Sequence, residues 1–135
     1  MEQQEFSDYI ISGLIRRYPQ FENCCKFKSD GIIDIEYESN QGLVTLRVTT
    51  QDREVTIGFS ANENQFGFHL HMSQLGATTP DEQLKEAINF IDDIIGDKET
   101  IIYSNIDGYM LGDINEIMKY QQPDELIATT VWSKL

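Results

Sequence analysis

The sequence lacks any long apolar run, and its amino-terminal residues lack the marks of a secretory signal. A helix that crosses a membrane needs about 20 consecutive apolar residues, and no stretch of this chain approaches that length. The opening residues, MEQQEFSDYI, are acidic and amphipathic, without the basic and apolar segments of a signal peptide. We therefore expect a cytoplasmic protein with no membrane partner.

Cysteine is also scarce, and the two that occur, Cys24 and Cys25, stand side by side. Neighbouring Cα atoms lie about 3.8 Å apart, which is shorter than the usual span of a disulfide. The CxxC spacing of redox and zinc motifs is missing, so we expect two reduced thiols. Either thiol could pair with His69 as nucleophile and base, but the surrounding NCCKFK has no recognisable nucleophile context.

Basic residues are few: 10 Lys and Arg stand against 23 Asp and Glu, which gives a net charge of −13. Such a surface repels nucleic acids and anionic membranes and attracts a basic protein. Basic patches with interleaved aromatic residues, which are typical of nucleic-acid binding, are missing. The acidity is also explained if the charge only keeps the protein soluble. It therefore favours a basic protein partner but does not require one.

Signatures of common enzyme classes are absent, because the sequence has no GxSxG, no P-loop and no GxGxxG. The clearest candidate for chemistry is the pair His69 and His71 in the stretch FGFHLHM. A catalytic zinc needs a third protein ligand. The nearest candidate is Glu54, which would complete the two-histidine, one-carboxylate set of non-haem iron. Histidines on a polar sheet face are nevertheless ordinary, and we expect no metal, no cofactor and no catalytic residue.

Apolar residues at helical spacing predict two main helices. The first runs from about Ser7 to Tyr18, where Pro19 stops it. The second begins after the N-cap Thr79 in TTPDEQLKEAINFIDDIIG, where Glu82 completes a capping box, and it closes at the final glycine of this stretch. Its predicted buried stripe comprises Leu84, Ala87, Ile88, Ile91, Ile94 and Ile95.

Four stretches alternate apolar with polar residues: GIIDIEYE, LVTLRVTT, REVTIGFS and FGFHLHM. The alternation predicts strands with one apolar face. Pairing apolar with apolar residues predicts a meander joined by two-residue turns, with Phe68 at the centre of the apolar face. The expected turns are Asn40-Gln41, Gln51-Asp52 and Asn62-Glu63, with Tyr37 opposite Val44, Val48 opposite Val55 and Phe59 opposite Phe66.

The remaining third of the chain predicts another hairpin and a final strand. TIIYSN and YMLGDI flank a turn at Asp107-Gly108, NEIMKYQQP reads as a short helical turn, and ELIATTVW as a last strand ending near Trp132. Taken together, the elements predict one α+β domain, residues 1–135. Its architecture is an antiparallel β-meander of about five to seven strands with two main helices packed on one face.

The same pairing predicts a polar sheet face that the helices leave open, with Asp34 opposite Arg47 and Glu54 opposite His71. This face is flat and mixes charges with threonines, so we prefer it as the surface that binds a basic partner. The solvated face of the second helix is the alternative. The candidate residues are Asp34, Glu36, Glu54, His69 and His71 on the sheet, and Glu86, Asp92 and Asp93 on the helix.

Several of these stretches also carry a family resemblance. The strand FGFHLHM, the helix AINFIDDIIGDK, the turn DGY and the tail TTVWSKL resemble the small bacterial immunity proteins of polymorphic-toxin and contact-dependent growth inhibition systems. The resemblance covers about residues 55–112 and the tail, and His71 departs from the single histidine of the pattern.

The resemblance implies a cytoplasmic protein that is not an enzyme and that binds and neutralises one cognate toxin, often a basic nuclease. Two alternatives stay open. One is a binding or regulatory domain outside toxin systems, and the other is a small metal-dependent enzyme that uses His69 and His71.

Overall fold

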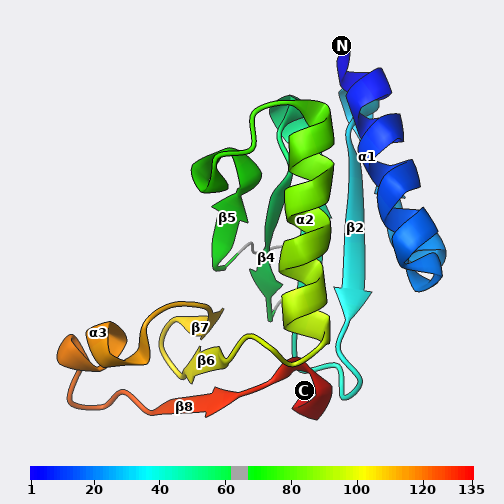
Figure 1. Ribbon diagram of the computed structural model, residues 1–135. Coiled ribbons are helices and arrows are strands. Elements are labelled where there is room, and N and C mark those ends of the chain that lie inside the picture. The colour runs from blue at the N-terminus through cyan, green and yellow to red at the C-terminus, as the bar shows by residue number, and fades with distance from the viewer. Residues whose placement is uncertain (62–66) are drawn as a thin grey trace.

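The computed structural model describes residues 1–61 and 67–135, and two antiparallel sheets form its frame (Figure 1). Sheet A, in the order β1-β2-β3-β4-β5, comprises β1 (Cys25–Phe27), β2 (Ile33–Glu38), β3 (Thr45–Thr49), β4 (Thr56–Ser60) and β5 (His69–His71). Sheet B, in the order β7-β6-β8, comprises β6 (Ile101–Ser104), β7 (Gly108–Met110) and β8 (Ile127–Thr130). The α-helices are α1 (Gln3–Arg17), α2 (Pro80–Ile95) and α3 (Ile114–Lys119). The predicted α+β class with an antiparallel sheet is confirmed.

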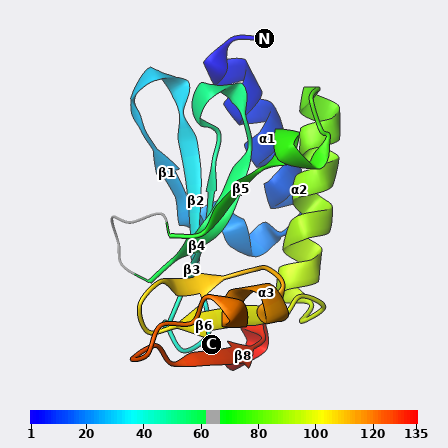
Figure 2. The ribbon, with the colours of Figure 1, turned by 90° about the vertical axis from the view of Figure 1, so that its left-hand side faces the viewer.

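Helices α1 and α2 lie side by side on one face of sheet A (Figures 1 and 2). The alternating apolar residues of the sheet point into this layer, and Leu46 and Ile57 are completely buried there. The helices approach closely at Gly13 of α1, where a Cβ atom would lie 2.5 Å from the side chain of Leu84 on α2. The main core therefore lies between sheet A and these two helices, as the apolar pattern predicts.

The start of α2 confirms the predicted capping box, and the start of α1 differs from the prediction. Thr79 Oγ1 accepts the Glu82 N–H at 3.2 Å, and Glu82 Oε1 accepts the Thr79 N–H at 3.2 Å. Helix α1 begins at Gln3, in a polar stretch that has no apolar period to reveal it. The Gln3 amide anchors this end, because its Nε2 donates to Thr50 O at 2.6 Å and its Oε1 accepts the Arg53 N–H at 3.0 Å.

The predicted register of the first hairpin is wrong by two residues, because Tyr37 lies opposite Leu46. The backbone N–H of Ser39 donates to Val44 O at 2.9 Å, so the loop consists of residues 40–43. A four-residue loop and a two-residue loop leave the same side chains on each face. The side-chain pattern therefore could not distinguish the two registers.

The second hairpin is shifted by the same amount, with Val48 opposite Ile57. Its longer loop contains a 3₁₀ turn, Gln51–Arg53. The buried Thr50 holds the loop, because its Oγ1 accepts the Ile33 N–H at 3.0 Å and donates to Ile33 O at 2.9 Å. Since a shift of two residues preserves the alternation, the predicted assignment of faces remains correct.

The third hairpin follows the same pattern, because the Phe59 N–H donates to Phe68 O at 2.9 Å. Phe68 therefore lies opposite Phe59, just before β5, and it is only partly buried. Its predicted place at the centre of the apolar face is wrong. The predicted turn Asn62-Glu63 and the residue Phe66 lie outside the described residues.

Sheet B is separate from the meander and lies at the end of sheet A where β4 contacts β7 (Figures 1 and 2). Its hairpin was predicted, but Ser104 pairs with Gly108, so the loop consists of residues 105–107. Gly108 begins β7 with φ +83°, a left-handed geometry that favours glycine. Strand β1 was not predicted, because three residues are too few to show an alternating pattern.

Candidate functional site

The face of sheet A opposite α1 and α2 carries the predicted sheet-face residues. The strand register aligns Glu36, Arg47, Gly58 and His69 in one row and Asp34, Thr49, Thr56 and His71 in the next. Both rows share a polar face, as predicted. Among the described residues no helix lies over this face (Figures 1 and 2).

The carboxylates on this face have internal partners. Asp34 Oδ2 lies 2.6 Å from Lys28 Nζ, and the Asp34 side chain is only 4% exposed. Its other oxygen, Oδ1, is buried with no hydrogen-bond partner among the described residues. Glu36 Oε1 lies 3.4 Å from Arg47 Nη2, so the residue opposite Arg47 is Glu36 and the predicted Asp34–Arg47 pair is wrong. These pairs leave the face less acidic than we expected.

Glu54 does not lie opposite His71, because Thr56 takes that place. The Thr56 hydroxyl and His71 Nδ1 are 2.6 Å apart. The Glu54 carboxylate instead accepts the Ser73 N–H at 3.1 Å and further hydrogen bonds from the Ser73 hydroxyl and the Gln83 amide. Glu54 therefore fastens its loop to the segment before α2 and to α2 itself.

The two histidines line a groove of about 440 Å³ at the β5 side of the polar face. The ring centroids of His69 and His71 lie 5.5 Å apart at a steep angle. No three His, Cys, Asp or Glu side chains come together to hold a metal ion within residues 1–61 and 67–135. The groove offers imidazole, hydroxyl, amide and carboxylate groups for hydrogen bonds; its other lining residues are Thr49, Gln51, Asp52, Glu54, Thr56 and Ser73.

The cysteines lie far from the histidines. Cys25 begins β1 and His69 begins β5, which are the two opposite edges of sheet A. Both thiols are free, and burial raises the pKa of Cys24 and of Cys25. A raised pKa lowers the fraction of reactive thiolate. The fold does not bring together the cysteine–histidine pair that the sequence allowed.

The three carboxylates of the predicted helix face differ in their surroundings. Asp92 Oδ1 accepts hydrogen bonds from Arg17 at 2.9 Å and from the Tyr18 hydroxyl at 2.6 Å, so it ties α2 to α1. Burial and the Asp92 carboxylate raise the pKa of Tyr18 well above its usual range. Glu86 and Asp93 are partly exposed, and neither has a side-chain hydrogen bond or ion pair with any described residue.

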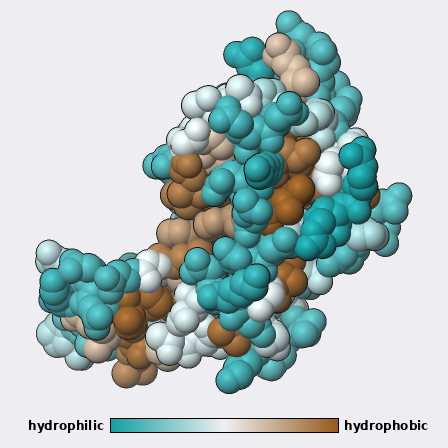
Figure 3. Space-filling model, in the orientation of Figure 1, coloured by the Kyte–Doolittle hydropathy of each residue, from teal (hydrophilic) through white to brown (hydrophobic). Residues whose placement is uncertain are grey.

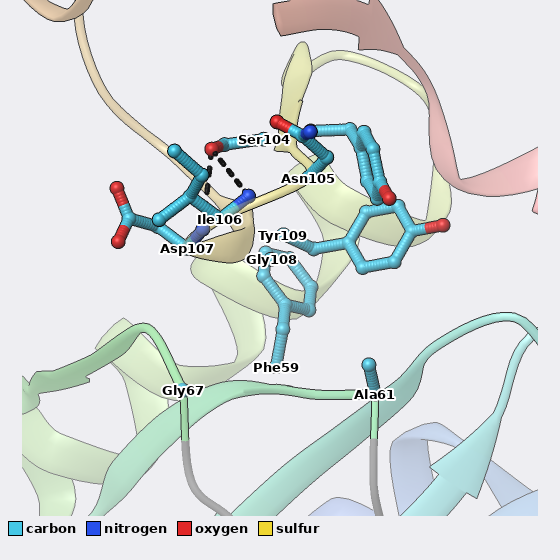
Figure 4. Close-up of a pocket in the computed structure, with 10 residues that line it drawn as sticks. Phe59, Ala61, Gly67, Ser104, Asn105, Ile106, Asp107, Gly108 and Tyr109 are labelled. Atoms are coloured by element: carbon cyan, nitrogen blue, oxygen red, sulfur yellow. Dashed lines mark hydrogen bonds between the residues drawn. The ribbon is translucent and has the colours of Figure 1, made fainter. Parts of the chain in front are cut away.

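A crevice of about 270 Å³ separates the end of sheet A from the β6–β7 hairpin, and the sequence did not predict it (Figure 4). Three aromatic rings line it: Phe59 from β4, and Tyr103 and Tyr109, whose centroids lie 4.9 Å apart. The Ser104 hydroxyl stiffens the opposite rim, because it accepts two backbone N–H groups of the turn at 3.1 Å each. The lining of the crevice combines aromatic rings with polar groups of the β6–β7 turn.

Several apolar side chains are exposed on the lobe formed by sheet B and α3. Tyr120 is 79% exposed and Leu126 is 71% exposed, and Ile106 and Met118 are also open to solvent. Figure 3 shows hydrophobic patches on this lobe, beside a hydrophilic outer end. Exposed apolar clusters mark interaction surfaces in many proteins. Sequence reasoning missed the lobe, because only the docking of sheet B shows that these residues stay uncovered.

Comparisons with known proteins return no match: no family model, no curated protein and no solved structure is similar to this chain. Among the helices of the described residues, none is long and apolar enough to cross a membrane. Function is therefore inferred from the chain's own charge, surfaces and geometry.

Proposed function

We propose that the protein binds and neutralises a basic partner protein, as the immunity proteins that its sequence resembles neutralise their toxins. The observation that carries this proposal is the excess of carboxylates that the fold leaves in solvent. The net charge is −13, and four ion pairs link basic to acidic side chains within the described residues. A field of this sign accelerates the approach of a basic protein and selects against acidic ones.

The arrangement of reactive side chains also favours binding over catalysis. The thiols and the histidines lie at opposite edges of sheet A, and Glu54 is engaged by Ser73 and Gln83. Catalysis needs reactive groups to converge on one substrate atom. Exposed apolar side chains beside solvent-facing carboxylates are instead the components of a protein interface.

The charge also suggests how binding would neutralise a nuclease. A nuclease binds its phosphate-rich substrate through basic side chains. An acidic protein that covers those side chains competes directly with the substrate. Its association should be fast at low ionic strength, and added salt should slow it.

Co-expression with a toxin tests the proposal. The probe is the carboxy-terminal domain of the protein encoded by the reading frame directly upstream of this chain's gene. We expect that domain alone to stop growth, co-expression of this chain to restore it, and the purified proteins to form a complex whose association rate falls with added salt.

Two results would contradict parts of the proposal. Growth arrest despite abundant, folded protein would contradict neutralisation. Binding without growth rescue would favour the alternative of a binding domain outside toxin systems.

The double variant Glu86→Gln with Asp93→Asn tests the electrostatic part of the proposal. It removes two carboxylates that have no partner in the described structure. It should weaken the salt dependence of the association rate without unfolding the protein.

A further inference from the structure

Strand β8 forms a free edge of sheet B, and its middle residues, Ala128 and Thr129, are exposed. Strand β8 pairs with β6 on one side and forms the outer margin of sheet B on the other (Figures 1 and 2). We propose that the basic partner adds a strand of its own to this edge. This inference rests on the proposed function and identifies the surface through which it acts.

The hydrogen bonds beside β8 show which backbone groups face outward. The Asn105 N–H donates to Leu126 O at 3.2 Å, and the Leu126 N–H donates to the side-chain Oδ1 of Asn105 at 2.8 Å, so residues 105 and 126 occupy a bonded position just beyond the ladder. Bonded and non-bonded pairs alternate along an antiparallel ladder. Ala128 therefore bonds to β6, whereas the N–H and C=O groups of Ile127 and Thr129 point away from it. These four groups match the hydrogen-bonding pattern of an added strand.

The sequence of β8 also lacks the usual protection of an edge. Natural edges carry lysine, proline or bulges that discourage a further strand. Residues 126–132, LIATTVW, have no charge and no proline. By contrast, β1 at the edge of sheet A contains Lys26 and is followed by Lys28, which would repel a basic strand. Strands β5 and β7, at the remaining edges, have three residues each.

The surroundings of β8 favour a basic occupant. Residues 97–135 carry seven Asp and Glu against three Lys. At the start of the edge, Leu126 is 71% exposed and would give an added strand an apolar contact. A second copy of this chain would bring the same negative charge to the edge, so repulsion opposes a homodimer. A partner strand flanked by Lys or Arg would meet acidic side chains and the outward-facing backbone groups of β8 at the same edge.

Amide hydrogen exchange of the wild-type protein tests this geometry without any substitution. The probe is the toxin domain of the growth experiment, added to saturation. In the free protein, the amides of Ile127 and Thr129 should exchange fast, while those of Ala128 and Thr130 are protected by β6. In the complex, exchange at Ile127 and Thr129 should slow by about 10-fold or more, because each gains a backbone partner.

A substitution on the free edge gives an independent test. Thr129→Pro removes an outward N–H and is compatible with an edge strand, so it should weaken binding by about 10-fold or more. Thr129→Val keeps the N–H and should bind like the wild type. Ala128→Pro removes a hydrogen bond to β6. The fall in its thermal midpoint therefore measures the loss of stability that is expected when sheet B itself is damaged.

The outcomes separate the two proposals. Failure of the wild type to bind the toxin domain contradicts the proposed function and this binding mode together. Binding with unchanged exchange at Ile127 and Thr129 contradicts the mode alone. If Thr129→Pro shares the lowered thermal midpoint of Ala128→Pro, the exchange measurement on the wild type decides the question.

Discussion

Sheets A and B differ in how far the segments beside them are covered. Sheet A has two helices on its apolar face, and residues such as Ile35 and Leu46 are fully buried. Sheet B has short strands and one short helix, and Tyr120 and Leu126 beside it are largely exposed. We infer that sheet A with its helices supplies most of the stability, whereas the lobe around sheet B is suited to contact with another molecule.

The largest expected effect lies in the core of sheet A. Phe59 is 1% exposed, so Phe59→Ala should lower the free energy of unfolding by about 3–5 kcal/mol. Phe68 faces it but is only partly buried, and Phe68→Ala should cost roughly 1–3 kcal/mol. Urea unfolding of both variants measures the difference. Equal losses would show that burial at the two positions is alike and that the strand pairing places Phe68 deeper than described.

A buried polar cluster beside α1 should have the next largest effect. The hydroxyls of Ser7 and Thr50 are 2.8 Å apart, and both residues are completely buried. Thr50→Val leaves the backbone N–H and C=O of Ile33 without their side-chain partner, so it should cost about 1–3 kcal/mol. Thr45→Val, on the partly exposed face of β3, is the matched control. A loss no larger than that of the control in urea unfolding would exclude a structural role for the cluster.

A smaller, pH-dependent effect is expected where α2 meets the carboxy-terminal turn. Two hydrogen bonds from Ser133, one of them from its N–H at 2.9 Å, hold the pKa of Asp97 below its usual value. A lowered folded-state pKa stabilises the fold above the unfolded pKa of about 4, and this contribution is lost as the pH falls through the folded value.

The Asp97→Asn variant makes this effect measurable. The thermal midpoint of the wild type should therefore fall more steeply between about pH 5 and pH 3 than that of Asp97→Asn. Parallel pH profiles of the two proteins would mean that Asp97 does not link α2 to the segment after β8. Ser133→Ala, which keeps the N–H but loses the hydroxyl, should show an intermediate slope.

The smallest effect on stability is expected at the lobe surface. Because Leu126 is 71% exposed, Leu126→Ser should change the free energy of unfolding by less than about 0.5 kcal/mol. The same variant should bind the toxin domain more weakly, since an apolar contact beside the β8 edge is removed. A large loss of stability would mean that sheet B depends on this side chain, and the contrast between the two sheets would then be weaker than described.

Much of the frame could be predicted because its signals are local. The Thr79–Glu82 capping box and Pro19 set helix boundaries within a few residues of chain. Alternation assigned the faces of β2, β3 and β4 correctly, since a strand has only two faces. The three predicted hairpin registers were wrong by two residues. A shift of two residues keeps every side chain on its face, so the alternation could not reveal the four-residue loop at residues 40–43 or the role of the buried Thr50.

The candidate site was harder to predict, because it depends on contacts between distant segments. Asp34 looked exposed in sequence, but Lys28 from the segment after β1 pairs with it. Glu54 looked like a partner of His71, yet Gln83 on α2 engages it. The exposure of Leu126 depends on how sheet B docks against sheet A. The local sequence around Leu126 carries no signal for this docking.

The meander order of sheet A has a consequence for the chain as it leaves the ribosome. Each strand pairs with the next one in sequence, so the sheet can form progressively from short-range contacts. Its apolar face, however, lacks the cover of α2 until residues 80–95 have been synthesised. After sheet A has formed and before α2 has been synthesised, the nascent chain exposes an unpaired strand edge and an apolar surface to chaperones and to neighbouring chains.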